Sequence, residues 1–171
     1  MTLLDDTVEE APEVLIALEK CGNPVCFIYP NADAGSRWLI ERVEKFAARR
    51  PGSRVLVNLD PKTYRSLLAE VGVLVGNSSS GIIESTSLSL PVVNVGIRQR
   101  GRDHARNVVD VPAKPDAIYQ AVGRALTPEF RSSIRGLTSP YGEGIAARII
   151  TDKLVQAPPR RKLLFKNPTL S

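Results

Sequence analysis

The sequence predicts an α/β fold, in which a parallel sheet carries helices on both faces. Three observations lead to this prediction. Short, continuously apolar segments of the kind that form buried parallel strands recur along the chain. Amphipathic segments with apolar residues at helical spacing lie between them. Proline, glycine and asparagine separate the two kinds of segment, and strands that alternate with helices form a parallel sheet with right-handed crossovers.

The first third of the chain contains two helix–strand pairs. Residues 8–20 are expected to form an amphipathic helix, and the apolar strand 25–29 follows it. A polar turn leads to a second helix at 36–49, for which Ser36 is a suitable N-cap. A Pro-Gly pair ends this helix, and the second strand is expected at 54–57.

The middle of the chain continues the alternation. A helix at about 61–70 opens with a proline, which suits the first helical turn. The strand 71–75 leads into a serine-rich loop and a helix that is expected to reach about residue 89. The fourth strand is 91–95, and a basic loop separates it from a fifth at 107–111.

Two more helices are expected, at about 114–126 and 143–156. Residues 157–171 are basic and contain several prolines, which is typical of a tail. We therefore expect a single domain over residues 1–156, followed by this tail.

The composition excludes several classes of protein. The 171 residues suffice for one domain with a hydrophobic core, and no apolar run approaches the roughly 20 residues that a membrane helix needs. The acidic N-terminal segment is unlike a signal or transit peptide, so we expect a cytoplasmic protein that does not bind membranes. The net charge of +5 suits an anionic partner, but no aromatic residue lies within a basic cluster, and nucleic-acid binding is not expected.

The cysteines and the single histidine indicate neither a metal site nor a cofactor. Cys21 and Cys26 match no zinc-binding pattern, and we expect two reduced thiols in or near the core. His104 cannot form a zinc site by itself, and a lone histidine beside arginines is expected at the surface.

The polar residues with binding potential follow the predicted strands. Ligands of parallel α/β sheets bind beyond the carboxyl ends of the strands. Three polar loops fall there, at residues 30–36, 76–81 and 96–106. We refer to the second as the serine loop and to the third as the basic loop.

The serine loop predicts a phosphate site. Glycines at both ends allow close approach of the backbone, three serines offer hydroxyl donors, and the following helix offers unpaired N–H groups. We expect Glu84 in the first turn of that helix, where Gly81 stands at the position that a capping box requires for Ser or Thr. A carboxylate would repel a phosphate but would accept hydrogen bonds from a ribose, so Glu84 is expected to face a ribose. An ordinary turn without a ligand is the alternative.

The other two loops allow two interpretations each. Arg98, Arg100 and Arg102 suit phosphate because a guanidinium donates two parallel hydrogen bonds, but a solvated basic loop has the same composition. Asn31 and Asp33 are candidate ligand contacts, although such residues in a turn often bond only to their own backbone.

Together, the segments 30–36, 75–84 and 91–102 resemble the C-terminal half of UDP-N-acetylglucosamine 2-epimerases. The resemblance runs from about Thr2 to the helix near residue 156. It is best to the hydrolysing branch, because the serine loop lacks the Gly-Gly pair and the acidic Gln-Glu-Glu run that are usual in the non-hydrolysing branch.

This resemblance implies the C-terminal, Rossmann-like domain of a GT-B-type enzyme, in which two such domains face each other across a cleft. The implied ligand is UDP or a UDP-sugar. Ser78 and Ser79 would contact the diphosphate, Glu84 the ribose, and the backbone at Leu59 and Asp60 would border the uracil. The implied binding residues are Asn31, Leu59, Ser78, Ser79, Gly81, Glu84, Arg98 and Arg102.

The family reaction removes the proton at C2 of the sugar, eliminates UDP to give a glycal, and adds water. UDP-N-acetylglucosamine and water thus give N-acetylmannosamine and UDP. The acid and base carboxylates of the family lie mainly in an N-terminal domain that this sequence does not contain. We therefore expect a fragment or one half of a split protein, with the missing domain as its partner, catalytic residues unassigned, and no activity alone.

Two other functions are left open by the sequence. One is the nucleotide-sugar-binding half of a GT-B glycosyltransferase, since serine loops with a ribose-binding glutamate occur there too. The other is a non-catalytic UDP-sugar-binding module, and the sequence also leaves a homo-oligomer open.

Overall fold

The computed structural model describes residues 4–28, 36–160 and 162. The chain divides into two compact units, Met1–Pro140 and Tyr141–Ser171. The expected domain boundary, after residue 156, lies inside the second of these units. Within the described residues, no helix is both long and apolar enough to cross a membrane.

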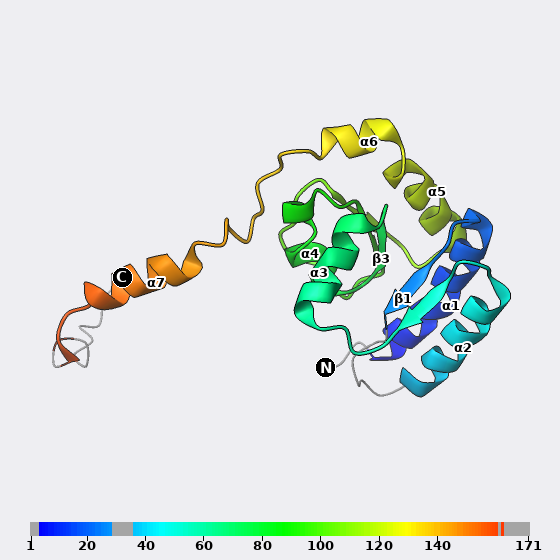
Figure 1. Cartoon of the computed structure of the whole chain (residues 1–171), viewed down its shortest axis with the longest axis horizontal. Helices are drawn as coiled ribbons and strands as arrows, with labels where there is room; N and C mark the ends of the chain where they lie inside the picture. The colour runs from blue at the N-terminus through cyan, green and yellow to red at the C-terminus, as the bar shows by residue number, and fades with distance from the viewer. Residues whose placement is uncertain (1–3, 29–35, 161, 163–171) are drawn as a thin grey trace. The chain divides into compact units, whose positions relative to one another are not determined.

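The first unit contains the predicted alternation of helices and strands (Figure 1). Its first elements are α1 (Leu4–Cys21), β1 (Cys26–Ile28), α2 (Ser36–Arg49), β2 (Arg54–Leu56) and α3 (Pro61–Glu70). The later elements are β3 (Leu74–Gly76), α4 (Ser79–Ile83), the 3-10 helix η1 (Thr86–Leu88), β4 (Val92–Val95), β5 (Val108–Val111), α5 (Pro115–Ala125) and α6 (Pro128–Ser133).

Two differences from the predicted elements go beyond a shift of their bounds. The helix after the serine loop is broken into α4 and η1, and it ends at Ser89, whose φ of 49° is left-handed. Helix α6 was not predicted, although Thr127 caps it by accepting a hydrogen bond from the Phe130 amide and Pro128 opens it. Both are ordinary signals of a helix start in the sequence.

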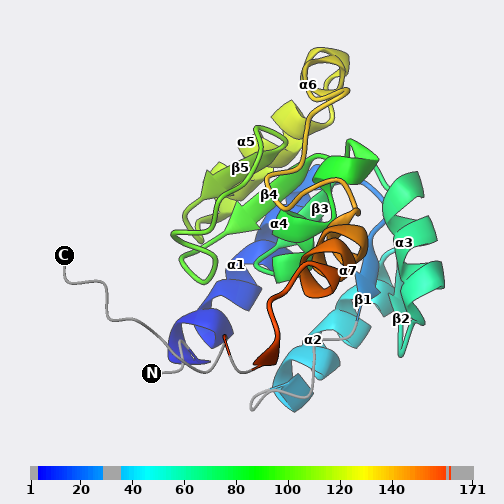
Figure 2. The same cartoon turned by 90° about the vertical axis from the view of Figure 1, so that its left-hand side faces the viewer.

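The strands are parallel and are hydrogen-bonded in two groups, β1–β2 and β3–β4–β5. Figure 2 shows the second group side by side. In this group Val93 of β4 pairs with Val75 of β3 and with Val109 of β5.

Helices cover both faces of this second group of strands, as predicted. Alternate side chains of each strand point to opposite faces and pack on different helices. Val93 and Val95 point to one face, where they pack with residues of α1, α5 and α6. Val92 and Val108 point to the other face and pack with Ile82 of α4. All four residues of β4 are buried, which explains its continuously apolar sequence apart from Asn94.

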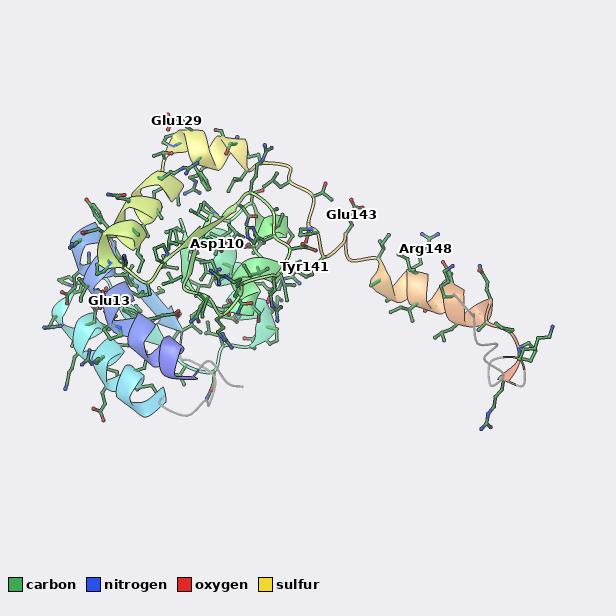
Figure 3. All side chains as sticks on the ribbon, turned by 180° about the vertical axis from the view of Figure 1, so that it is seen from behind. Glu13, Asp110, Glu129, Tyr141, Glu143 and Arg148 are labelled. Atoms are coloured by element: carbon green, nitrogen blue, oxygen red, sulfur yellow. The ribbon has the colours of Figure 1, made fainter. Side chains whose placement is uncertain are left out.

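The second unit contains α7 (Ala146–Val155), a helix without a buried residue. Side chains project outward along it (Figure 3), and its apolar residues are exposed, with Ile150 at 57% and Leu154 at 70%.

Candidate functional site

The serine loop and the basic loop meet at the carboxyl ends of β3 and β4, as the sequence analysis predicted. Arg98 Nη1 and Gln99 Nε2 both donate to the carbonyl oxygen of Asn77, at 3.1 Å and 2.8 Å. Each loop leaves its strand at a glycine with positive φ, which is 146° at Gly76 and 77° at Gly96. The third loop, with Asn31 and Asp33, lies outside the described residues.

The serines of the serine loop differ in their roles. Ser78 is exposed and caps α4, since its Oγ accepts a hydrogen bond from the Ser80 amide at 3.3 Å. Ser79 is half-buried and is the first residue of the helix. The Ser80 hydroxyl is hydrogen-bonded to the Tyr64 hydroxyl of α3 at 2.5 Å, which ties α3 to the loop.

One prediction about this loop needs correction. Glu84 is not in the first turn of its helix, because α4 ends at Ile83 and Glu84 is its C-cap, with an amide that donates to Ser80 O at 2.9 Å. Gly81 is buried, and a Cβ there would lie 3.1 Å from Val92 Cγ1 and 3.3 Å from Leu74 Cδ2. Its small size therefore allows α4 to pack closely on the sheet.

The turn at Leu59 and Asp60 connects β2 to α3. Leu59 is half-buried, and Asp60 is the N-cap of α3, with Oδ1 accepting from the amides of Lys62 and Thr63 at 3.0 Å and 3.1 Å. The hydrogen bond from the Thr63 hydroxyl, followed by that from the Thr63 amide, lowers the pKa of the Asp60 carboxyl. Because Tyr64 in the next turn contacts Ser80, this turn and the serine loop belong to one connected region.

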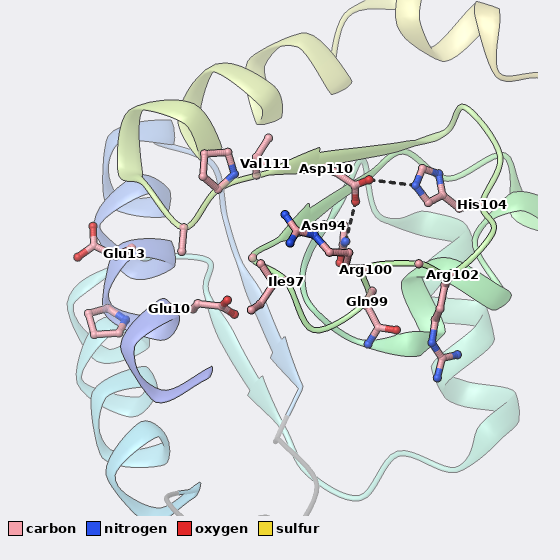
Figure 4. Close-up of a pocket in the computed structure, with 15 residues that line it drawn as sticks. Glu10, Glu13, Asn94, Ile97, Gln99, Arg100, Arg102, His104, Asp110 and Val111 are labelled. Carbon is pink, nitrogen blue, oxygen red and sulfur yellow. Dashed lines mark hydrogen bonds and ion pairs between the residues drawn. The ribbon is translucent and has the colours of Figure 1, made fainter. Parts of the chain in front are cut away.

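A cavity of about 1060 Å³ lies beyond the ends of β4 and β5 (Figure 4). Glu10 and Glu13 of α1 line one side, and Arg100, Arg102 and His104 of the basic loop line the other. The structure thus separates two of the predicted phosphate-binding arginines. Arg102 lines this cavity, whereas Arg98 is held at the serine loop.

His104 is part of a hydrogen-bonded chain that sequence reasoning missed. Its Nε2 lies 3.0 Å from Asp110 Oδ2, and Asp110 Oδ1 accepts from Asn94 Nδ2 at 2.7 Å (Figure 4). A signal was available, because Asn94 and Asp110 are the polar residues of their apolar strands and are register partners. These hydrogen bonds fix the far end of the basic loop to β5.

Glu10 is the second residue that the sequence analysis missed. It is buried, and its Oε2 accepts a hydrogen bond from Asn77 Nδ2 at 2.9 Å. The signal for this contact is its place one helical turn before Val14, on the face of α1 that packs into the core.

Within the described ranges, no group of three or more His, Cys, Asp or Glu side chains is placed to hold a metal ion. The donors that the site offers are amides, hydroxyls and guanidinium groups, which suit oxygen-rich anions such as phosphates.

Comparison with known proteins shows similarity to one family of enzymes. A family model described as UDP-N-acetylglucosamine 2-epimerase matches residues 2–155. A polysialic acid biosynthesis protein, P7, of Escherichia coli is 33% identical over 135 residues, which are 78% of this chain and 34% of the relative. A UDP-N,N'-diacetylbacillosamine 2-epimerase (hydrolyzing) of Legionella pneumophila is 35% identical over 138 residues, covering 80% of this chain and 35% of the relative.

Solved structures show the same fold at low sequence identity. The UDP-GlcNAc 2-epimerase of Neisseria meningitidis, bound to UDP-GlcNAc, superposes with a TM-score of 0.62 and 17% identity, over 86% of this chain and 40% of that structure. The chain spans about a third of the length of the curated relatives it matches.

Proposed function

This chain belongs to the UDP-N-acetylglucosamine 2-epimerase family, and we propose that it forms the UDP-binding half of a hydrolysing enzyme of that family. The complete enzyme would convert UDP-N-acetylglucosamine and water to N-acetylmannosamine and UDP through a glycal. Two relatives whose names include the word hydrolyzing support this branch of the family.

The observation that carries the proposal is the meeting of the serine loop and the basic loop at Asn77. It places the exposed guanidinium of Arg98 beside the capped start of α4, where Ser78 and Ser79 stand. A guanidinium and two hydroxyls beside a helix start, which has a partial positive charge, are complementary to a diphosphate. Glu84 would accept the ribose hydroxyls, and the turn at Leu59 would border the uracil.

In this role the chain holds the leaving group of the elimination. Negative charge grows on the diphosphate as its bond to the sugar breaks, and donors fixed in advance around it lower the barrier. A second domain would supply the acid and base groups and close the cleft. The chain alone would bind UDP without turning over UDP-sugars.

Titration calorimetry of this chain with UDP tests the proposal. We expect saturable binding, and the Glu84→Ala variant should bind about tenfold more weakly, because a hydrogen bond to a charged acceptor contributes about 1.5 kcal/mol. Glu41→Ala is the matched control, since Glu41 is an exposed carboxylate on α2.

The absence of binding to UDP would contradict the proposal, as would equal affinities of the Glu84→Ala and Glu41→Ala variants. N-acetylmannosamine formed from UDP-N-acetylglucosamine by the purified chain would contradict the need for a second domain.

A further inference from the structure

Glu10 is a carboxylate at a helix position that faces the core. Val14, Ala17 and Cys21 follow it at helical spacing on α1 and pack into the main hydrophobic cluster. The residue is only 8% exposed. Burial of a carboxylate costs free energy unless polar groups compensate it, so the position of Glu10 requires a specific set of partners.

Both loops of the site supply contacts to this carboxylate. Oε2 accepts a hydrogen bond from the side-chain amide of Asn77 in the serine loop, at 2.9 Å. The carboxylate also stands against the Cα of Gly96, at the start of the basic loop, where a Cβ would collide with it. Gly96 therefore meets two requirements, a φ of 77° and room for Glu10.

Asn77, which is held by Glu10, in turn binds side chains of the basic loop that lie beside the start of α4. Its carbonyl oxygen accepts hydrogen bonds from Arg98 at 3.1 Å and from Gln99 at 2.8 Å. Gln99 is 5% exposed, so its amide is held in place by the surrounding chain. Asn77 is thus fixed through its side chain by α1 and through its main chain by the basic loop.

We propose that Glu10 is a positioning residue of the nucleotide site: it fixes Asn77, and through Asn77 it fixes Arg98 and the entry to α4. This inference rests on the proposed function, in which these groups hold the diphosphate. Because both loops are ordered before the nucleotide arrives, less conformational entropy is lost on binding. Glu10 touches neither the nucleotide nor the sugar in this role.

The first test uses the whole chain without nucleotide. Hydrogen exchange of the segment 76–84, followed by mass spectrometry, should be at least several-fold faster in the Glu10→Ala variant. Glu10→Gln should remain near the wild type, because its amide oxygen still accepts from Asn77. The control Glu41→Ala should not change this segment. Unchanged exchange in Glu10→Ala would overturn the proposal.

The second test is a double-mutant cycle on the affinity for UDP. Glu10 and Arg98 are joined through Asn77, so the two substitutions should be strongly coupled. If Glu10→Ala and Arg98→Ala each weaken binding about tenfold, the double variant should also lose about tenfold rather than about a hundredfold. Independent, multiplying losses would show a general structural role and would refute the positioning role.

If the Glu10→Ala variant does not fold, a third test exchanges the donor and the acceptor of the hydrogen bond between residues 10 and 77. Asn77→Asp places a second carboxylate against Glu10 and should accelerate exchange in 76–84. The pair Glu10→Gln with Asn77→Asp restores one donor and one acceptor and should return exchange toward the wild type, and failure to do so counts against the proposal. If the wild-type chain does not bind UDP, the proposed function fails, while the exchange measurements still decide the role of Glu10.

Discussion

At the residue scale, the two cysteines differ in burial, although only four residues separate them in the sequence. Cys21, at the end of α1, is half-buried and packs beside the main core. Burial raises the pKa of its thiol, and the positive charge of Arg50 offsets part of that effect. Cys26, at the start of β1, is exposed, so the prediction of a thiol in or near the core is wrong for it.

We therefore predict that Cys26 reacts faster with iodoacetamide than Cys21. The reactive species is the thiolate, and a raised pKa leaves less of it on Cys21 at pH 8. The rate at Cys21 should keep increasing as the pH approaches its raised pKa. Alkylation of the single variants Cys21→Ser and Cys26→Ser measures each thiol separately, and equal rates at pH 8 would contradict this prediction.

At the scale of elements, a buried polar network replaces the continuous helix that was expected after the serine loop. Asn107, which is fully buried, donates to Ser85 Oγ at 2.8 Å and to Leu90 O at 2.9 Å. Its Oδ1 accepts from the Thr86 hydroxyl at 3.1 Å. Ser85 in turn donates to Gly81 O at 2.5 Å. These hydrogen bonds supply donors to the carbonyl oxygens of Gly81 and Leu90, in the segment that runs from α4 through η1.

The Asn107→Ala variant should be less stable by about 2–4 kcal/mol, because it leaves buried groups such as Leu90 O without a partner. Urea unfolding followed by circular dichroism measures this change. Asn23→Ala, in the exposed turn after α1, is the matched control and should change stability by less than about 0.5 kcal/mol. A similar loss in both variants would contradict a structural role for the network.

At the scale of the whole molecule, the core belongs to the first unit. The buried residues of the described chain lie between Glu10 and Ile134, and α7 of the second unit buries none of its residues. Ile134 is fully buried in the main cluster together with Phe130 of α6. The first unit therefore contains the hydrophobic contacts that its own stability requires.

We predict that a chain ended at Pro140 keeps a cooperative thermal transition close to that of the whole chain. A chain ended at Ala125, which lacks Phe130 and Ile134, is the control and should melt at a clearly lower temperature. Circular dichroism on the three proteins decides this point. Loss of the transition in the Pro140 chain would show that the second unit is needed for folding.

The sequence by itself determined the class of fold, the alternation of helices and strands from α1 to α5, and the two loops that meet at the carboxyl ends of β3 and β4. These features are predictable because they rest on local patterns. Apolar periodicity, a proline at a helix start and glycines that allow positive φ act within a few residues. The resemblance of the serine and basic loops to the epimerase family also lies in contiguous segments.

The tertiary structure alone decided which residues hold that site together. Glu10 meets Asn77 across 67 positions of sequence, and Gln99 meets it across 22. The helix breaks after α4, which makes Glu84 a C-cap, and the segment after the break is hydrogen-bonded to Asn107, just before β5. Such contacts arise from packing between elements, and no local pattern encodes which distant partner a buried polar side chain will find. For this reason the sequence indicated the candidate binding loops, and the fold showed how they are fixed.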